Sequence, residues 1–229
     1  MLAHGFTNHT GTRHVRAIAR GLSEQGLGVL AYDARGHGRS DGHSTLGDLE
    51  PLDLDAAVAA ARRLGYRSVV TCGWSMGGSV AIRHAALRGG LVGGQLLSHP
   101  PDAVVSVSTT SRWYYRDTVA MRRVLFVIQN RSGRAVARVV LRTRIWPLPW
   151  DPQPASPVEC IVDVAPLPLL LVHGDADHYF PLEHPYELAA AAGDGAQLWI
   201  EAGMGHAEKA ATPDLIARLA RQIRSLVPA

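Results

Sequence analysis

Short apolar runs alternate along the chain with longer stretches in which apolar residues recur every three or four positions. The short runs are rich in β-branched residues and apolar nearly throughout, which is typical of parallel strands covered on both faces. The longer stretches have the spacing of amphipathic helices. The predicted strands are 27–33, 68–73, 102–108, 168–173 and 196–201, and the predicted helices are 12–25, 52–64, 76–88, 183–192 and 213–226. This alternation predicts an α/β fold with a doubly wound, mostly parallel sheet.

Two segments interrupt the alternation. Residues 109–160 are rich in arginine and end in a proline-rich run, Trp146-Pro-Leu-Pro-Trp-Asp-Pro-Gln-Pro154, which suits neither a helix nor a strand. We interpret residues 109–160 as a helical lid inserted into a core made of residues 1–108 and 161–229. Residues 89–101 are rich in glycine and proline, and we expect them to form a mobile loop.

The composition narrows the class of protein. Of the 229 residues, 47% are hydrophobic and 19% are charged, which is ordinary for a globular protein and excludes wholesale disorder. No apolar run approaches the roughly 18 residues of a membrane-spanning helix, and the N-terminus lacks the pattern of a signal peptide. Cys72 and Cys160 are too few for a disulfide framework, so we expect free thiols in a reducing compartment. These features predict a soluble, cytoplasmic protein.

The basic residues are concentrated in one part of the chain. The net charge is +3, and Lys209 is the only lysine. The segment 112–144 contains nine arginines and one acid, Asp117, so the rest of the chain is net acidic. A uniformly basic nucleic-acid binder would not have this distribution, and no nucleic-acid module surrounds the neighbouring Tyr115. We therefore expect no nucleic-acid partner.

The arginines of this segment allow two interpretations. Four of them are spaced by three and four residues, so in a helix they would line one face. These are Arg131, Arg134, Arg138 and Arg142. Either this face is solvated or paired with the acidic body, or some of these arginines, or Arg112 and Arg116, face the site and attract anionic substrates.

The residues Gly73-Trp-Ser-Met-Gly77 lie between a predicted strand and a predicted helix. This is the context of the G-x-S-x-G nucleophile elbow, in which the serine occupies a strained strand-to-helix turn and the flanking glycines relieve crowding. The hydroxyl of Ser75 would then lie above the sheet, at a helix N-terminus whose N–H groups stabilise a developing oxyanion. The alternative is an ordinary glycine-rich turn; we predict a nucleophilic Ser75.

A nucleophilic serine needs an acid and a base, which follow it in the chain order Ser, acid, His. His206, in a loop after the 196–201 strand, is the predicted base, the alternative being a surface histidine. Asp175 and Asp177 follow the 168–173 strand; we assign the acid to Asp177 and expect Asp175 to brace the turn. Both segments lie at carboxyl ends of strands, where open α/β sheets bind ligands.

Two backbone N–H groups are candidates for oxyanion binding. His4-Gly-Phe-Thr7 begins a turn before the first predicted helix, and the N–H of Phe6 would face that of Met76. His4, His9 and His14 are spaced by five residues and share no face of a helix or strand, so we predict no metal site.

Five segments, in this order and across nearly the whole chain, resemble motifs of the α/β-hydrolase superfamily. They are His4-Gly-Phe6, Asp33-Ala-Arg-Gly-His-Gly-Arg-Ser40, Gly73-Trp-Ser-Met-Gly77, His173-Gly-Asp-Ala-Asp177 and Gly205-His206. The resemblance is to serine hydrolases of the esterase and lysophospholipase type. It implies a Ser75–His206–Asp177 triad, oxyanion donors on Phe6 and Met76, and a lid between the sixth strand of the family and the following helix. It also implies that the 33–40 loop, with His37, is structural.

The chain departs from this family at its start. Two strands and a hairpin normally precede the His-Gly loop, whereas here only Leu2-Ala3 does. We expect this short segment to have little to hold it and the sheet edge to be unpaired, which predicts a homodimer or an aggregation-prone monomer.

We interpret the protein as a serine hydrolase that cleaves a small-molecule carboxylic ester through an acyl-enzyme, without a cofactor or metal. The predicted substrate-binding residues are Trp74, Trp113, Tyr114 and Arg112. The alternatives are a thioesterase or another acyl or C–C bond hydrolase, because the fold does not decide among them, and a binding protein without turnover. A serine at position 75 argues against the dehalogenases and epoxide hydrolases of the superfamily, which use a carboxylate nucleophile.

Overall fold

The computed structural model describes residues 1–227. Its centre is a sheet of five parallel strands in the order β1-β2-β5-β6-β7. These strands are β1 (Leu2–Ala3), β2 (Val70–Trp74), β5 (Ala103–Val107), β6 (Leu169–Gly174) and β7 (Ala196–Glu201). A doubly wound α/β sheet was predicted from the buried apolar runs, and the structure confirms this fold class.

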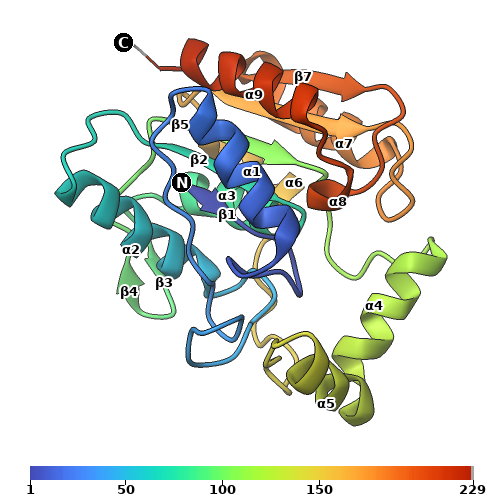
Figure 1. Ribbon diagram of the computed structural model, residues 1–229. Coiled ribbons are helices and arrows are strands. Elements are labelled where there is room, and N and C mark those ends of the chain that lie inside the picture. The colour runs from blue at the N-terminus through green and yellow to red at the C-terminus, as the bar shows by residue number, and fades with distance from the viewer. Residues whose placement is uncertain (228–229) are drawn as a thin grey trace.

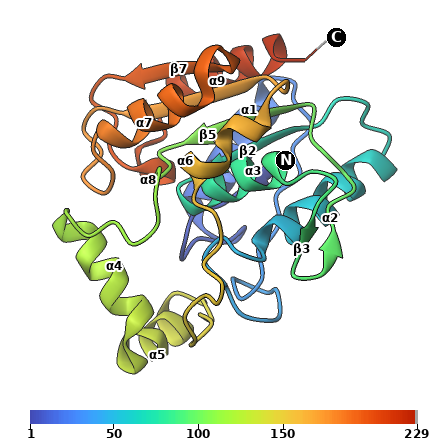
Figure 2. The ribbon, with the colours of Figure 1, turned by 180° about the vertical axis from the view of Figure 1, so that it is seen from behind.

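Helices cover both faces of the sheet. On one face lie α1 (Arg13–Glu24) and α9 (Pro213–Ser225), in front of the sheet in Figure 1. The opposite face, in front in Figure 2, carries the remaining core helices. These are α2 (Glu50–Arg63), α3 (Met76–Ala86), α6 (Pro157–Cys160), the 3₁₀ turn η1 (Ile161–Val164) and α7 (Glu183–Ala192). Each face has its own buried apolar cluster, so the strands are apolar on both sides.

Residues 27–33 do not form the predicted strand. The N–H of Leu2 donates to the carbonyl of Leu30 at 2.9 Å, and Leu2 makes one isolated bridge with Ala31. The neighbour of this segment is β1, and because β1 has only two residues it cannot support a longer ladder. The same contacts correct the expectation that the chain start is loosely held. Leu2 and Ala3 are each 2% exposed, between β2 and the 27–33 segment.

Residues 89–101, expected to be a mobile loop, contain a hairpin of β3 (Leu91–Val92) and β4 (Gln95–Leu96). Gly93 and Gly94 connect the strands with φ values of 53° and 78°. Two successive positive φ values are those of a type I′ turn, which glycine adopts without strain.

A buried carboxylate fixes the segment after this hairpin. Asp55 of α2 accepts a hydrogen bond from the backbone N–H of His99 at 2.8 Å, and it contacts the His99 ring at 2.8 Å and the His84 ring at 3.3 Å. Burial alone would raise the pKa of Asp55, but the hydrogen bonds from the two histidines lower it to about 2. The ionised carboxylate is therefore favoured in the folded state.

Asp55 predicts a pH dependence of stability. Because its pKa is lowered by folding, the stabilisation is present above the ordinary range of an aspartate and is lost as the pH falls towards 2. We expect Asp55→Asn to lower the free energy of unfolding by about 2 kcal/mol near pH 6, with a much smaller difference near pH 2. Urea titrations at the two pH values measure this. Asp163→Asn, at an exposed site, is the control, and an equal cost at both pH values would contradict the prediction.

Two helices stand apart from the sheet and its covering helices. They are α4 (Val119–Gln129) and α5 (Arg131–Val140), at the lower edge of Figures 1 and 2. The N-cap of α4, Thr118, accepts from the N–H of Met121 at 3.2 Å and donates to the carbonyl of Tyr179 at 3.0 Å. After α5 the chain runs along the 36–44 loop, with hydrogen bonds from Gly38 to Arg142 and from Trp146 to Ser44. Both ends of this segment are thus attached to the core.

The predicted four-arginine face is shorter in the structure. Helix α5 ends at Val140, and Arg142 has a φ of 51° outside the helix. Arg134 donates to the carbonyls of Ile128 and Gln129 at 2.9 and 3.0 Å, so it satisfies the end of α4. Within residues 1–227, no helix has both the length and the apolar character needed to cross a membrane.

Candidate active site

Ser75 lies in a tight turn between β2 and α3. Its φ of 52° and ψ of −118° belong to a strained conformation, and such strain is common at functional sites. Glycines on both sides make the turn possible. A Cβ at Gly73 would lie 2.1 Å from the carbonyl oxygen of Gly77, and a Cβ at Gly77 would lie 2.3 Å from that of Ala3. The predicted elbow geometry is therefore present at Ser75.

Ser75, His206 and Asp177 form a continuous hydrogen-bonded chain. The Nε2 atom of His206 lies 3.0 Å from the Ser75 hydroxyl oxygen, and Nδ1 lies 2.7 Å from Oδ2 of Asp177. An ionised carboxylate can only accept, so Nδ1–H donates to Asp177 and Nε2 is left to accept from Ser75. This tautomer is the one that a general base next to a serine needs.

Asp177 is held ionised by its surroundings. Its side chain is fully buried, and burial alone would raise its pKa. The hydrogen bond and charge of His206, together with the N–H groups of Tyr179 and Phe180, hold the pKa below its ordinary value. Those N–H groups donate to Oδ1 at 2.8 and 3.1 Å. Asp175 instead accepts from the N–H of Gly203 at 2.6 Å, bracing the turn as predicted.

The imidazole of His206 is also fixed by aromatic packing. The ring of Tyr179 lies 4.3 Å away between centroids at an angle of 32°, and that of Phe180 lies 5.4 Å away at 72°. His206 is the last residue before the short helix α8 (Ala207–Ala210), whose first N–H donates to the Ser108 hydroxyl at 3.1 Å. Two aromatic rings and one carboxylate thus define the orientation of the His206 imidazole.

The two predicted oxyanion donors belong to the turn and the helix on either side of Ser75. Phe6 and Met76 line the cavity that contains Ser75, and neither backbone N–H donates to another atom of residues 1–227. Met76 is the first residue of α3, where N–H groups have no partner within the helix. Gly5 lets the turn lie close to Ser75, since a Cβ at Gly5 would lie 3.1 Å from that of Ser75.

Sequence reasoning did not identify Glu208, a buried acid next to this turn. Glu208 is 4% exposed, and its Oε1 accepts from the N–H of Gly5 at 2.6 Å. Burial raises its pKa, while hydrogen bonds from Gly5 and Asn8 and the charge of His206 act in the opposite direction. The only sequence signal is an acid two residues after His206, and 203 positions separate Glu208 from its partner Gly5. Its contact with the turn can be seen only in the folded chain.

Glu208 predicts a measurable effect on turnover. We expect Glu208→Ala to lower kcat roughly tenfold with little change in KM, because the Gly5 N–H loses its buried acceptor and the Phe6 turn is released. Glu208→Gln keeps an acceptor oxygen and should retain most of the activity. Steady-state kinetics with melting temperatures distinguish the cases. If Glu208→Ala only melts at a lower temperature, with kcat unchanged, the carboxyl contributes to stability alone.

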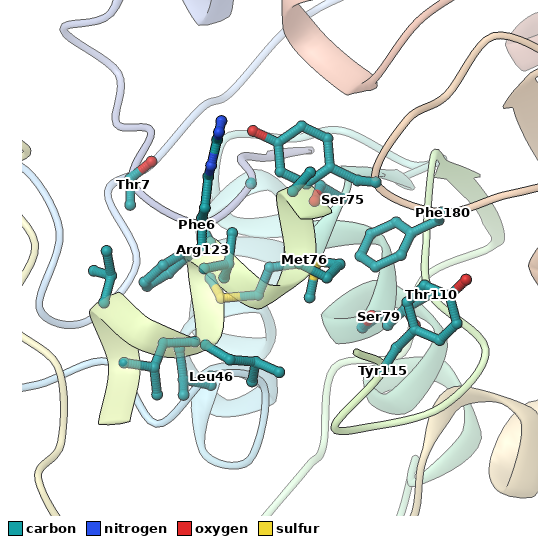
Figure 3. Close-up of a pocket in the computed structure, with 18 of the residues that line it drawn as sticks. Phe6, Thr7, Leu46, Ser75, Met76, Ser79, Thr110, Tyr115, Arg123 and Phe180 are labelled. Carbon is teal, nitrogen blue, oxygen red and sulfur yellow. The ribbon is translucent and has the colours of Figure 1, made fainter. Parts of the chain in front are cut away.

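These residues line a cavity of about 1320 Å³. Ser75, Met76 and Phe6 lie on its core side, and α4 passes across it in the close-up of Figure 3. Most of the other lining side chains are apolar or aromatic. Among them are Leu46, Met121, Val124, Ile128, Trp146 and Leu148. A long apolar group fits such a cavity better than a small polar molecule.

Of the four predicted substrate-binding residues, three line the cavity. Trp113 does so while its Nε1–H donates to the carbonyl of Pro154 at 2.9 Å, and Tyr114 is 45% exposed beside it. Arg112 also lines it, ion-paired with Glu183. Trp74 was predicted wrongly. As the last residue of β2 it points into the apolar cluster under α1 and α9 and is 0% exposed.

The sequence also predicted a structural role for His37 and no metal site. His37 is buried, and its Nδ1 contacts the carbonyl of Arg35 at 3.0 Å, which fits a structural loop. Within residues 1–227, no three His, Cys, Asp or Glu side chains are arranged to hold a metal ion.

Comparisons with known proteins agree with this architecture. The family model described as "Serine aminopeptidase, S33" matches residues 1–137. A monoacylglycerol lipase of Mycolicibacterium smegmatis is 30% identical over 208 residues, covering 80% of this chain and 71% of that protein. A non-heme haloperoxidase of Rhodococcus erythropolis is 26% identical over 216 residues, covering 81% and 77%.

Solved structures show the same fold. The esterase Pf2001 of Pyrococcus furiosus superimposes with a TM-score of 0.73 at 21% sequence identity, covering 99% of this chain and 81% of that one. The family match extends over more than half of the chain, and the aligned lipase covers most of it. The chain therefore belongs to the serine aminopeptidase S33 (Hydrolase_4) family and is an α/β hydrolase of the serine-hydrolase type.

Proposed function

We propose that the protein hydrolyses carboxylic esters through an acyl-enzyme formed on Ser75. One observation carries this proposal: Ser75, His206 and Asp177 are linked by hydrogen bonds of 3.0 and 2.7 Å at the floor of a large apolar cavity. Esterases and lipases among the similar proteins support hydrolysis of an ester as the reaction.

In the first half-reaction His206 takes the proton of Ser75 as its oxygen attacks the ester carbonyl. The N–H groups of Phe6 and Met76 bind the oxyanion of the tetrahedral intermediate. They bind it more strongly than the planar carbonyl oxygen of the ground state. His206 then gives its proton to the leaving alkoxide, and the acyl group stays on Ser75. Asp177 remains ionised and stabilises the imidazolium.

In the second half-reaction His206 activates a water molecule, which attacks the acyl carbonyl from the side that the alcohol has left. The oxyanion forms again at the same two N–H groups. Its collapse breaks the bond to Ser75, the proton on His206 returns to the serine oxygen, and the carboxylic acid leaves.

Residues 109–160 act in this proposal as a lid on a core of residues 1–108 and 161–229. Helix α4 supplies much of the apolar lining, and the return segment adds Trp146, Leu148 and Trp150. The acyl chain lies against these side chains, which exclude water from the reacting carbonyl. The expected homodimer is a separate prediction, which sedimentation would test.

Covalent labelling tests the proposal. A fluorophosphonate probe should modify Ser75 in the wild type and leave Ser75→Ala unmodified. Ser79 is a matched control, because it also lines the cavity and its buried hydroxyl has no hydrogen-bond partner in the described chain. Ser79→Ala should label as the wild type does. Labelling that persists in Ser75→Ala would overturn the assignment.

The bond cleaved can be determined with a substrate panel. We expect turnover of para-nitrophenyl esters to rise with acyl length from acetate to decanoate, because the cavity is large and apolar. Acyl-CoA thioesters of the same chain lengths test the thioesterase alternative. Faster cleavage of the thioesters at equal acyl length would replace ester by thioester in the proposal.

A further inference from the structure

The cavity next to Ser75 carries more positive charge than its surroundings neutralise. Four basic residues line it: Arg112, Arg123, Arg134 and Lys209. Two of them have partners. Arg112 is paired with Glu183 at 2.9 Å and with Glu187 at 3.4 Å, and Arg134 is hydrogen-bonded to the end of α4.

Arg123 and Lys209 are different. Their side chains make no ion pair and no hydrogen bond within residues 1–227, although both line the cavity. They come from two elements, Arg123 from α4 and Lys209 from α8, three positions after His206. In Figure 3 Arg123 is drawn on the helix that crosses the cavity, and Phe6 and Met76 are among the other lining residues. Arg123 and Lys209 are both exposed, and an unpaired guanidinium group therefore belongs to the lining of the cavity that also contains Ser75.

The described lining contains one carboxyl group that could balance these cations, that of Glu208. Its Oε1 is already engaged by the N–H of Gly5, and burial favours its neutral form. The remaining polar groups are hydroxyls, amides and histidines. The two cations thus face the cavity without a permanent counter-charge from the protein.

The rest of the lining is apolar, which restricts what the counter-charge can belong to. Met121, Val124, Val127 and Ile128 lie on the same helix as Arg123 and also line the cavity. A small inorganic anion would leave these side chains in contact with water. A molecule that joins an alkyl or acyl chain to one anionic group satisfies both parts of the lining.

We infer that the preferred substrate is an amphiphilic ester that carries a carboxylate or phosphate, and that Arg123, assisted by Lys209, binds this anionic group. The inference rests on the proposed ester hydrolysis and specifies its substrate. Arginine suits the task because its planar fork forms two parallel hydrogen bonds with either oxyanion. This assignment to Arg123 and Lys209 replaces the expectation from sequence that Arg112, Arg116 or the arginines of residues 131–142 bind the anionic group.

Two matched substrate pairs test the inference and locate the anionic group. The first pair is the mono-para-nitrophenyl ester of suberic acid and its methyl-capped analogue, which place the charge on the acyl side. The second is decanoylglycerol phosphate and decanoylglycerol, which place it on the alcohol side. In one of the pairs we expect the anionic member to have a kcat/KM about tenfold higher at low salt. High salt should reduce this preference by screening.

The variants identify the residue responsible. Arg123→Gln should remove most of the preference, mainly through a higher KM for the anionic member, and Lys209→Gln should remove a smaller part. Arg138→Gln is the matched control: it deletes the same charge from the neighbouring helix α5 at an exposed site outside the cavity. The ratio of the two kcat/KM values should not change in this control.

Two results would overturn the inference: no preference for the anionic member of either pair in the wild type, or an equal fall of the ratio in Arg138→Gln and Arg123→Gln. In both cases, hydrolysis of the neutral esters and labelling of Ser75 would leave the proposed function standing. Absence of neutral-ester turnover together with absence of Ser75 labelling would instead refute the proposed function itself.

Discussion

Ser75→Ala is expected to abolish ester hydrolysis, with a loss of kcat that can reach about 10⁶-fold. The substitution removes one hydroxyl, whose hydrogen bond is to His206, and keeps the Cβ that the elbow accommodates. The melting temperature should therefore change little. Single-turnover and steady-state assays on purified protein measure the loss.

His206→Ala should lose about as much activity, and the double variant should lose hardly more, because the two residues act as one unit. More than a tenth of wild-type activity in Ser75→Ala would show that another group is the nucleophile. Ser79→Ala provides the comparison for removing a hydroxyl from the same cavity.

Asp177→Asn is expected to lower kcat by about 10⁴-fold while the fold is maintained. The N–H groups of Tyr179 and Phe180 point at Oδ1, so the amide oxygen of the new asparagine would take this position. Its NH₂ group would then face Nδ1 of His206 and donate to it. This reverses the tautomer and leaves Nε2–H, which cannot accept the proton of Ser75.

Asp175→Asn is the control for this second prediction, because Asp175 is a carboxylate in the same turn. It keeps an oxygen for the N–H of Gly203 and should alter the melting temperature more than kcat. A large loss of kcat in Asp175→Asn, together with near-normal turnover in Asp177→Asn, would exchange the roles of the two acids.

Those parts of the site that depend on local sequence could be predicted. Gly73 and Gly77 are required by backbone contacts within the elbow itself, and the pattern of glycines around Ser75 reports this directly. The strands β2, β5, β6 and β7 are short runs that are apolar at most positions, and because they are parallel, Asp177 and His206, which follow β6 and β7, come to the same edge of the sheet. Such signals need no knowledge of distant contacts.

The predictions from sequence fail where residues far apart along the chain come into contact. Trp74 precedes Ser75 in the elbow motif, which suggested that it lies in the site. Only the packing under α1 and α9 shows that its side chain points into the core. Glu208 acts on Gly5 across almost the whole chain. The 27–33 segment has the composition of a strand, but its ladder is limited by the two residues of its neighbour β1.

The two apolar clusters of the core contain no residue of α4 or α5. The helices that supply much of the cavity lining can therefore change their side chains without a cavity or strain arising beneath the sheet. In evolutionary terms, this arrangement would allow substrate range and folding stability to be selected separately. A library of substitutions in α4 should yield many folded proteins with altered selectivity, whereas the same number of changes around the elbow should yield mostly unfolded ones.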